Sequence, residues 1–122
     1  MIDALLDSTI TIDHLNGVPG SGAAIAMWRL PAVSIMTWME VMAGAATVDQ
    51  EDALRAYLGR FPLVGLSGAI ANDAFRLRRD RRLKLPDAII LATARYLKVP
   101  LLTRNTKDFD ATEPGIIVPY RI

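Results

Sequence analysis

The sequence predicts one α/β domain, residues 1–122, with a central parallel β-sheet of about five strands flanked by helices. Short apolar runs alternate with helical patterns along the whole chain, and no internal repeat, linker or low-complexity tract interrupts them. The 122 residues, of which 52% are hydrophobic, suffice for one domain with a sizeable core. Because helices connect most successive strands, the strands are expected to run parallel.

The first half of the chain begins with the apolar run DALLDST, residues 3–9, which predicts a strand. The following ITIDHLNG predicts a short helix that ends at Gly17, and the Gly- and Pro-rich segment 17–22 predicts a loop. Pro31 then introduces a short strand, which two helices follow. This strand and these helices are predicted at 32–35, 36–46 and about 49–57.

The second half repeats the alternation of strand and helix. PLVGLS, residues 62–67, predicts a strand that precedes a helix at about 68–82. Pro86 suits the first turn of a helix because its φ angle is fixed, and this helix is expected to end near Leu97. Two further strands are predicted at 99–105 and 115–120, the last at an edge or end of the sheet because it contains Pro119.

The composition excludes several classes of protein. The chain has no cysteine, which rules out disulfides, thiolate zinc sites and a cysteine nucleophile. His14 is the only histidine and is expected on a helix surface, so serine–histidine catalysis has little support. The apolar runs are far shorter than the roughly 18 residues of a membrane span, and the first residues are acidic where a signal peptide is basic. A cytoplasmic protein is therefore expected.

Four carboxylates stand at informative places in the predicted fold. Asp7 ends the first strand, Glu40 lies among apolar residues of the helix after the second, Asp87 begins a later helix, and Asp108 follows the fourth strand. Open parallel sheets place their sites beyond the carboxyl ends of the strands, where these acids would meet. Each acid also has an ordinary interpretation: a helix cap, a buried ion pair, a helix start and a loop acid, respectively.

Convergence would give these acids a common role. Gathered carboxylates repel one another and need a cation, and oxygen ligands without histidine or cysteine suit Mg²⁺ or Mn²⁺. The basic residues are gathered too, because six of the fourteen Lys and Arg lie between Arg76 and Lys84. This cationic segment is either a solvated helix face or a surface for phosphate groups.

Four motifs carry a resemblance to a known family. In order and spacing, LLDSTITIDHL, SIMTWMEVMAG, LPDAIILATA and LLTRNTKDF resemble the motifs of PIN-domain ribonucleases of the VapC toxin type, and the resemblance covers nearly the whole chain. It implies a PIN-like fold and an acidic site that binds metal and catalyses the reaction, formed by Asp7, Glu40, Asp87 and Asp108. The polar groups implied to support this site are Ser8, Thr103 and Asn105.

Two positions depart from the family pattern. The family usually has Asp-Thr-Asn in the first motif, whereas this chain has Asp7, Ser8 and Thr9, so an amide is replaced by a hydroxyl. The fourth acid is ambiguous because Asn105, Asp108 and Asp110 lie close together, and Asp108 is preferred.

The resemblance implies an endoribonuclease that uses Mg²⁺, with Mn²⁺ as the alternative, and that acts as the toxin of a toxin–antitoxin pair. It also implies a homodimer with a groove for the antitoxin, and the high apolar content agrees with surface for a partner. A PIN-like domain that binds RNA or a protein without cutting is the alternative, and Thr9 is its main support. The residues expected to contact the RNA backbone are Arg78, Arg79, Arg82, Lys84 and Arg104.

Overall fold

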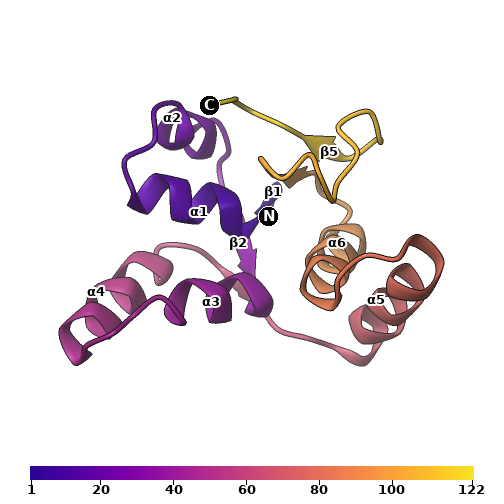
Figure 1. Ribbon diagram of the computed structural model, residues 1–122, viewed down its shortest axis with the longest axis horizontal. Helices are drawn as coiled ribbons and strands as arrows, with labels where there is room; N and C mark the ends of the chain where they lie inside the picture. Colours follow the sequence, from indigo (N-terminus) through magenta and orange to yellow (C-terminus); the bar gives the residue numbers. More distant parts are fainter.

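A computed structural model describes all residues, 1–122, and confirms the predicted fold class (Figure 1). One five-stranded sheet has the order β3-β2-β1-β4-β5, and all neighbouring strands run parallel. The strands are β1 (Ala4–Leu6), β2 (Pro31–Ser34), β3 (Leu63–Val64), β4 (Leu101–Leu102) and β5 (Ile116–Ile117). The helices are α1 (Ser8–Leu15), α2 (Ser21–Ala26), α3 (Ile35–Met42), α4 (Val48–Leu58), α5 (Gly68–Arg81) and α6 (Leu85–Leu97).

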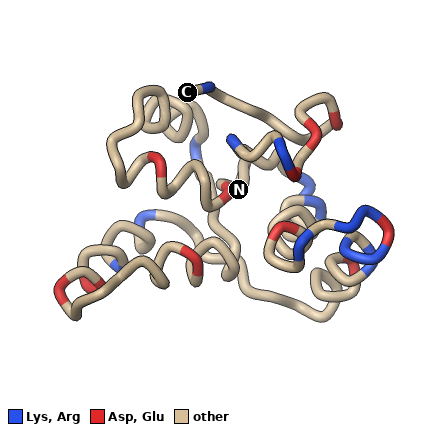
Figure 2. Tube along the Cα trace, in the orientation of Figure 1, with Lys and Arg blue, Asp and Glu red and all other residues tan.

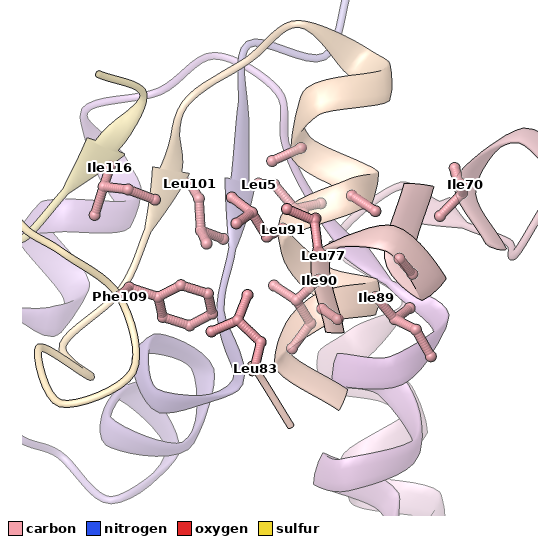
Figure 3. Packing of buried hydrophobic residues seen from close by; sticks show 14 of the residues in the cluster. Leu5, Ile70, Leu77, Leu83, Ile89, Ile90, Leu91, Leu101, Phe109 and Ile116 are labelled. Carbon is pink, nitrogen blue, oxygen red and sulfur yellow. The ribbon is translucent and has the colours of Figure 1, made fainter. Parts of the chain in front are cut away.

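Helices cover both faces of the sheet. Successive side chains of a strand point to opposite faces, and those of the central strands β1 and β4 are all buried. On one face, Leu5, Leu101 and Ile116 pack with residues of α5 and α6 such as Leu77 and Ile90 (Figure 3). On the other face, a smaller cluster joins strand residues to α1 and α2. Its buried members are Ala4, Leu6, Ile10, Ile25, Val33, Phe61 and Leu102. Burial on both faces explains why the central strands are continuous apolar runs.

The structure differs from the sequence prediction mainly in extent. The predicted helices in the second half appear as α5 and α6, and β5 lies at the edge of the sheet as expected. The strands β1, β3, β4 and β5 are shorter than predicted, whereas β2 has the predicted length and begins one residue earlier. Ser8 and Thr9 belong to α1 and not to the first strand. Helix α2 occupies a segment for which no helix was predicted. None of the helices is both long and apolar enough to cross a membrane.

Strand ends and helix starts coincide at the carboxyl edge of the sheet. Asp7 links β1 to α1, and Ser34 ends β2 and caps α3, since its hydroxyl oxygen accepts a hydrogen bond of 3.1 Å from the backbone N–H of Thr37. Thr103 follows β4, which pairs with β1. The side chains at this edge are therefore held by elements that are themselves fixed in the core.

Candidate metal centre at the carboxyl edge of the sheet

Asp7 is the most enclosed of the four acids. It is 3% exposed, and its Oδ2 accepts hydrogen bonds from the hydroxyl groups of Thr9 at 2.8 Å and Thr103 at 2.7 Å. Although Asp7 occupies the position before α1, its side chain makes no capping hydrogen bond to that helix. Burial raises the pKa of Asp7 above its usual range, and the two hydroxyl donors act in the opposite direction. Helix capping therefore does not explain this residue.

Asp87 lies in the first turn of α6, and the negative charges of the three other acids all raise its pKa. Its pKa is raised to about 6, first by burial and then by the negative charges of Asp108, Asp7 and, more weakly, Glu40. Among the charges that act on Asp87, that of Asp108 has the largest effect on its pKa. Carboxylates from three other segments thus act on Asp87, as the topology predicts.

Asn105, Asp108 and Asp110, the three candidates for the fourth site residue, have different surroundings in the structure. Asp108 is half-buried and accepts a hydrogen bond of 2.9 Å from the side-chain amide of Asn105, which is the main cause of its lowered pKa. Asp110 is exposed and pairs with Thr112 at 2.7 Å. Asp108 is therefore the acid that faces Asp87, and Asn105 orients it.

Glu40 differs from the expectation of an acid buried among apolar side chains. It is an exposed residue of α3, and neighbouring Met39 is 51% exposed, so the apolar run around it is partly on the surface. No ion pair involves Glu40, which contradicts its interpretation as half of a buried salt bridge. Its Oε1 instead accepts a hydrogen bond of 2.6 Å from the hydroxyl of Ser8. Ser8, which follows Asp7 in the first motif, is thus bonded to a second acid of the site.

Thr9, the residue that departs from the family pattern, has a defined place. Its hydroxyl donates to Asp7 Oδ2 at 2.8 Å and accepts a hydrogen bond of 3.1 Å from the backbone N–H of Arg104. A side chain without an amide therefore still connects Asp7 to the loop after β4.

That loop is held by an ion pair that sequence patterns did not reveal. The guanidinium of Arg104 forms two hydrogen bonds with buried Asp13, from Nε at 2.5 Å and from Nη2 at 2.9 Å. The hydroxyl of Tyr120 donates to the same carboxylate at 2.8 Å, and the Tyr120 side chain lies against Gly20, where a Cβ would come within 3.2 Å of it. The Arg104 pairing, with its hydrogen bonds as the main cause, keeps the pKa of Asp13 below its usual range. The guanidinium of Arg104 is thus already engaged within the chain.

Of the other predicted substrate contacts, Lys84 lies beside the acids. Lys84 immediately precedes α6, and its charge contributes to the lowered pKa of Asp108. Arg78 and Arg79 lie in the last turn of α5 and Arg82 directly follows this helix, where Figure 2 shows a concentration of basic residues. The basic end of α5 is therefore followed, after a short turn, by the helix that carries Asp87 in its first turn.

The acids suit a hard divalent cation by their chemistry. All donors are carboxylate oxygens, and the pKa of Asp87 is raised first by burial and then by the neighbouring negative charges, whose repulsion a cation would relieve. No three acidic or histidine side chains approach closely enough to form a ready-made metal group. Mg²⁺ does not require one, because it is usually bound through one or two carboxylates together with water and substrate phosphates. Asp7, Asp87 and Asp108 are the residues that could hold such an ion.

Comparison with known proteins agrees with this geometry. The family model described as the PIN domain matches residues 4–113. The chain belongs to the PIN-domain family. The PIN domain is 30% identical to Ribonuclease VapC19 of Mycobacterium tuberculosis over 95% of this chain and 98% of that protein. PIN-domain ribonucleases generally depend on a divalent metal ion.

Solved structures give the same result for the fold. A toxin–antitoxin complex from Klebsiella pneumoniae contains a chain that is 45% identical to this PIN domain, with a TM-score of 0.90, and the match covers 98% of this chain and 100% of that one. A chain of VapBC2 from Rickettsia felis, bound to a DNA fragment from its promoter, is 21% identical with a TM-score of 0.76, over 100% of this chain and 99% of that one. The latter likeness supports the fold alone.

Proposed function

We propose that this PIN domain is a metal-dependent endoribonuclease that acts as the toxin of a toxin–antitoxin pair in the cytoplasm. The observation that carries the proposal is that Asp108, Asp7 and Glu40, which come from three other segments, all act on Asp87 by their negative charge. The similarity to Ribonuclease VapC19 and to a chain of a toxin–antitoxin complex supports the substrate class and the kind of partner. We further propose that the chain forms a homodimer that binds its antitoxin.

The residues divide into holding and orienting groups. Asp7, Asp87 and Asp108 would hold Mg²⁺ or Mn²⁺, and Thr9, Thr103 and Asn105 fix the directions of two of these carboxylates through hydrogen bonds. A divalent ion bound there would stabilise negative charge on the scissile phosphate and lower the pKa of an attacking water.

Glu40 has a different role in this proposal. Its Oε1 is bonded to Ser8, and as an exposed residue it would orient the attacking water through its remaining oxygen. Lys84 lies beside the acids and would attract the phosphate backbone without reading the sequence of the RNA. Binding without cleavage has less support, since the hydroxyl of Thr9 bonds to Asp7 where the family has an amide.

The test of this proposal is cleavage of a panel of RNAs, including tRNA and ribosomal fragments, by the purified protein. We expect cleavage with Mg²⁺ or Mn²⁺ and none in excess EDTA, because carboxylates without a cation repel the phosphate. Restoring the metal should restore cleavage, and Asp7→Asn should remain inactive throughout. Equal cleavage with and without EDTA would contradict the proposal.

Thr9→Val tests the support of Asp7 separately. Valine keeps the branched shape but removes the hydroxyl that bonds to Asp7 Oδ2, so we expect the affinity for Mn²⁺ or the cleavage rate to fall by about 10 to 100-fold. Calorimetric titration with Mn²⁺ and a cleavage assay measure the two effects. Thr106→Val is the matched control, because Thr106 is exposed on the loop after β4. Equal behaviour of the two variants would show that the Thr9 hydroxyl is dispensable.

A further inference from the structure

A hollow of about 430 Å³ lies on the outer side of α5, lined by Phe75, Arg78, Arg79 and Arg82. These residues are three or four positions apart and therefore share one face of the helix. The opposite face carries the buried residues Ile70, Ala74 and Leu77, which pack toward α6. The hollow is thus not part of the core, and we call it the Phe75 pocket.

Phe75 gives the pocket a flat aromatic surface. The residue is 54% exposed, so its ring contributes little to folding. The guanidinium carbon of Arg79 lies 5.2 Å from the ring centroid, which is a cation–π contact. A ring beside a guanidinium plane is the combination on which proteins stack unpaired nucleic-acid bases.

The arginines of the pocket are only weakly engaged within the protein. Arg79 pairs with Asp80 at 2.8 Å, but both side chains are about 60% exposed, so the pair contributes little. Arg78 makes one long hydrogen bond of 3.4 Å to the carbonyl of Leu83. Basic residues in a last helical turn are favourable for the helix dipole alone, yet that effect does not account for the exposed aromatic ring among them.

The position of the pocket connects it to the acids. Arg82 follows the last residue of α5, and only Leu83 and Lys84 separate it from α6, which carries Asp87 in its first turn. Arg82 and Asp87 are five residues apart, so their Cα atoms are separated by at most about 18 Å. An RNA strand with its scissile phosphate at the acids would therefore reach the pocket with a nearby nucleotide.

We propose that the Phe75 pocket binds an unpaired nucleotide of the RNA substrate close to the cleavage position. The base stacks on Phe75 and Arg79, and Arg78 and Arg82 bind the adjoining phosphates. This inference rests on the proposed ribonuclease function and adds to it a preference for single-stranded RNA, since paired bases are not free to stack on a side chain.

The experiment compares Phe75→Leu, Phe75→Tyr and the control Tyr96→Leu in the full chain. Leucine keeps an apolar side chain without a ring, tyrosine keeps the ring, and Tyr96 is an exposed aromatic residue on α6. Fluorescence anisotropy in EDTA measures binding of a single-stranded RNA and of an RNA duplex without cleavage. Melting curves check that the variants fold, and cleavage with Mg²⁺ gives kcat and KM separately.

We expect Phe75→Leu to weaken binding of the single strand about ten-fold, a loss that is typical of a stacked base, while Phe75→Tyr and Tyr96→Leu change it little. Duplex binding should be insensitive to the ring, and Phe75→Leu should raise KM more than it lowers kcat. Ring-dependent binding by a protein that cuts no RNA would support the pocket and contradict the nuclease proposal. Unchanged single-strand affinity in Phe75→Leu would overturn the pocket, and a simultaneous loss of self-association in light scattering would assign the ring to a protein interface.

Discussion

Asp87→Asn is expected to abolish RNA cleavage while leaving the metal-free protein at least as stable as the wild type. The substitution removes one negative charge from a group of four and deprives the metal of a ligand. Because metal-assisted hydrolysis draws several kcal/mol of transition-state stabilisation from the ion, cleavage should fall at least about a hundred-fold. The stabilisation of the fold by Mn²⁺ should shrink as well, since it follows the affinity for the ion.

The pH dependence of stability provides an independent check on Asp87. Its pKa is about 6 in the folded chain, mainly through burial and then the charge of Asp108, and about 3.9 when unfolded. An acid whose pKa is raised by folding destabilises the fold as it ionises, so the wild type should lose stability relative to Asp87→Asn as the pH rises from about 4 to 6. Above pH 6 the difference should be constant, at roughly 1 kcal/mol, because Asp87 is half exposed and screened.

Urea unfolding in EDTA at several pH values measures this difference, and melting curves with and without Mn²⁺ measure the effect of the metal. Asp49→Asn is the matched control, because Asp49 lies in the first turn of α4 and serves a helix start alone. We expect this control to lose about 0.3 to 1 kcal/mol and to keep its activity. If Asp87→Asn behaves in the same way as Asp49→Asn, Asp87 is a helix-start residue and the metal assignment fails.

Arg104→Ala is expected to destabilise the fold by about 2 to 3 kcal/mol. The substitution leaves Asp13, whose side chain is 6% exposed, without its charged partner, and an unpaired buried charge is costly. The estimate lies at or below the lower end of the usual range for buried pairs, since the side chain of Arg104 is 32% exposed. Tyr120→Phe removes only one hydrogen bond to Asp13 and should cost about 1 to 2 kcal/mol.

Urea unfolding at neutral pH measures these losses, with Arg81→Ala as the control because Arg81 forms a surface pair with Glu113. The control should lose no more than about 1 kcal/mol. The pKa of Asp13 is depressed by its hydrogen bonds to Arg104, so the stabilisation is present above the unfolded pKa of about 3.9 and is lost as the pH falls through the folded pKa. Wild-type stability in Arg104→Ala, with RNA affinity alone reduced, would show that Arg104 serves the substrate and not the fold.

Sequence alone was sufficient for the fold class because the strands are short apolar runs separated by helices, and the topology follows from that alternation. Helices α4, α5 and α6 lie close to their predicted ranges; in the structure Thr47 and Ser67 cap the first two, and Pro86 lies in the first turn of the third. Helix α2 was missed because no side chain caps it. It begins after Gly20, which has a left-handed φ angle, and a glycine in a Gly- and Pro-rich segment predicts a loop.

The sequence predicted that the acids meet at the carboxyl edge of the sheet, but it did not predict which side chains bond to them there. Asp7 could be placed at the end of the first strand and Thr103 in the fourth, but a hydrogen bond between residues 96 positions apart depends on packing. For Glu40, an apolar run indicates burial, yet the sequence does not distinguish a core from an exposed apolar surface. Asp13, Arg104 and Tyr120 come from three distant segments, and no local periodicity marks such a group.

The strand order has a consequence for synthesis of the chain. The middle strand, β1, is made first, whereas β4, its neighbour on one side, is made near the end. At about 5 to 20 residues per second, roughly 5 to 20 s separate the synthesis of Asp7 from that of Asp108. Throughout this interval the nascent chain lacks Asp108, and for most of it also Thr103, so the carboxylates are not yet assembled. Before Asp108 is made, a protein proposed to cut RNA therefore has no complete site with which to attack the ribosome and messenger that are producing it.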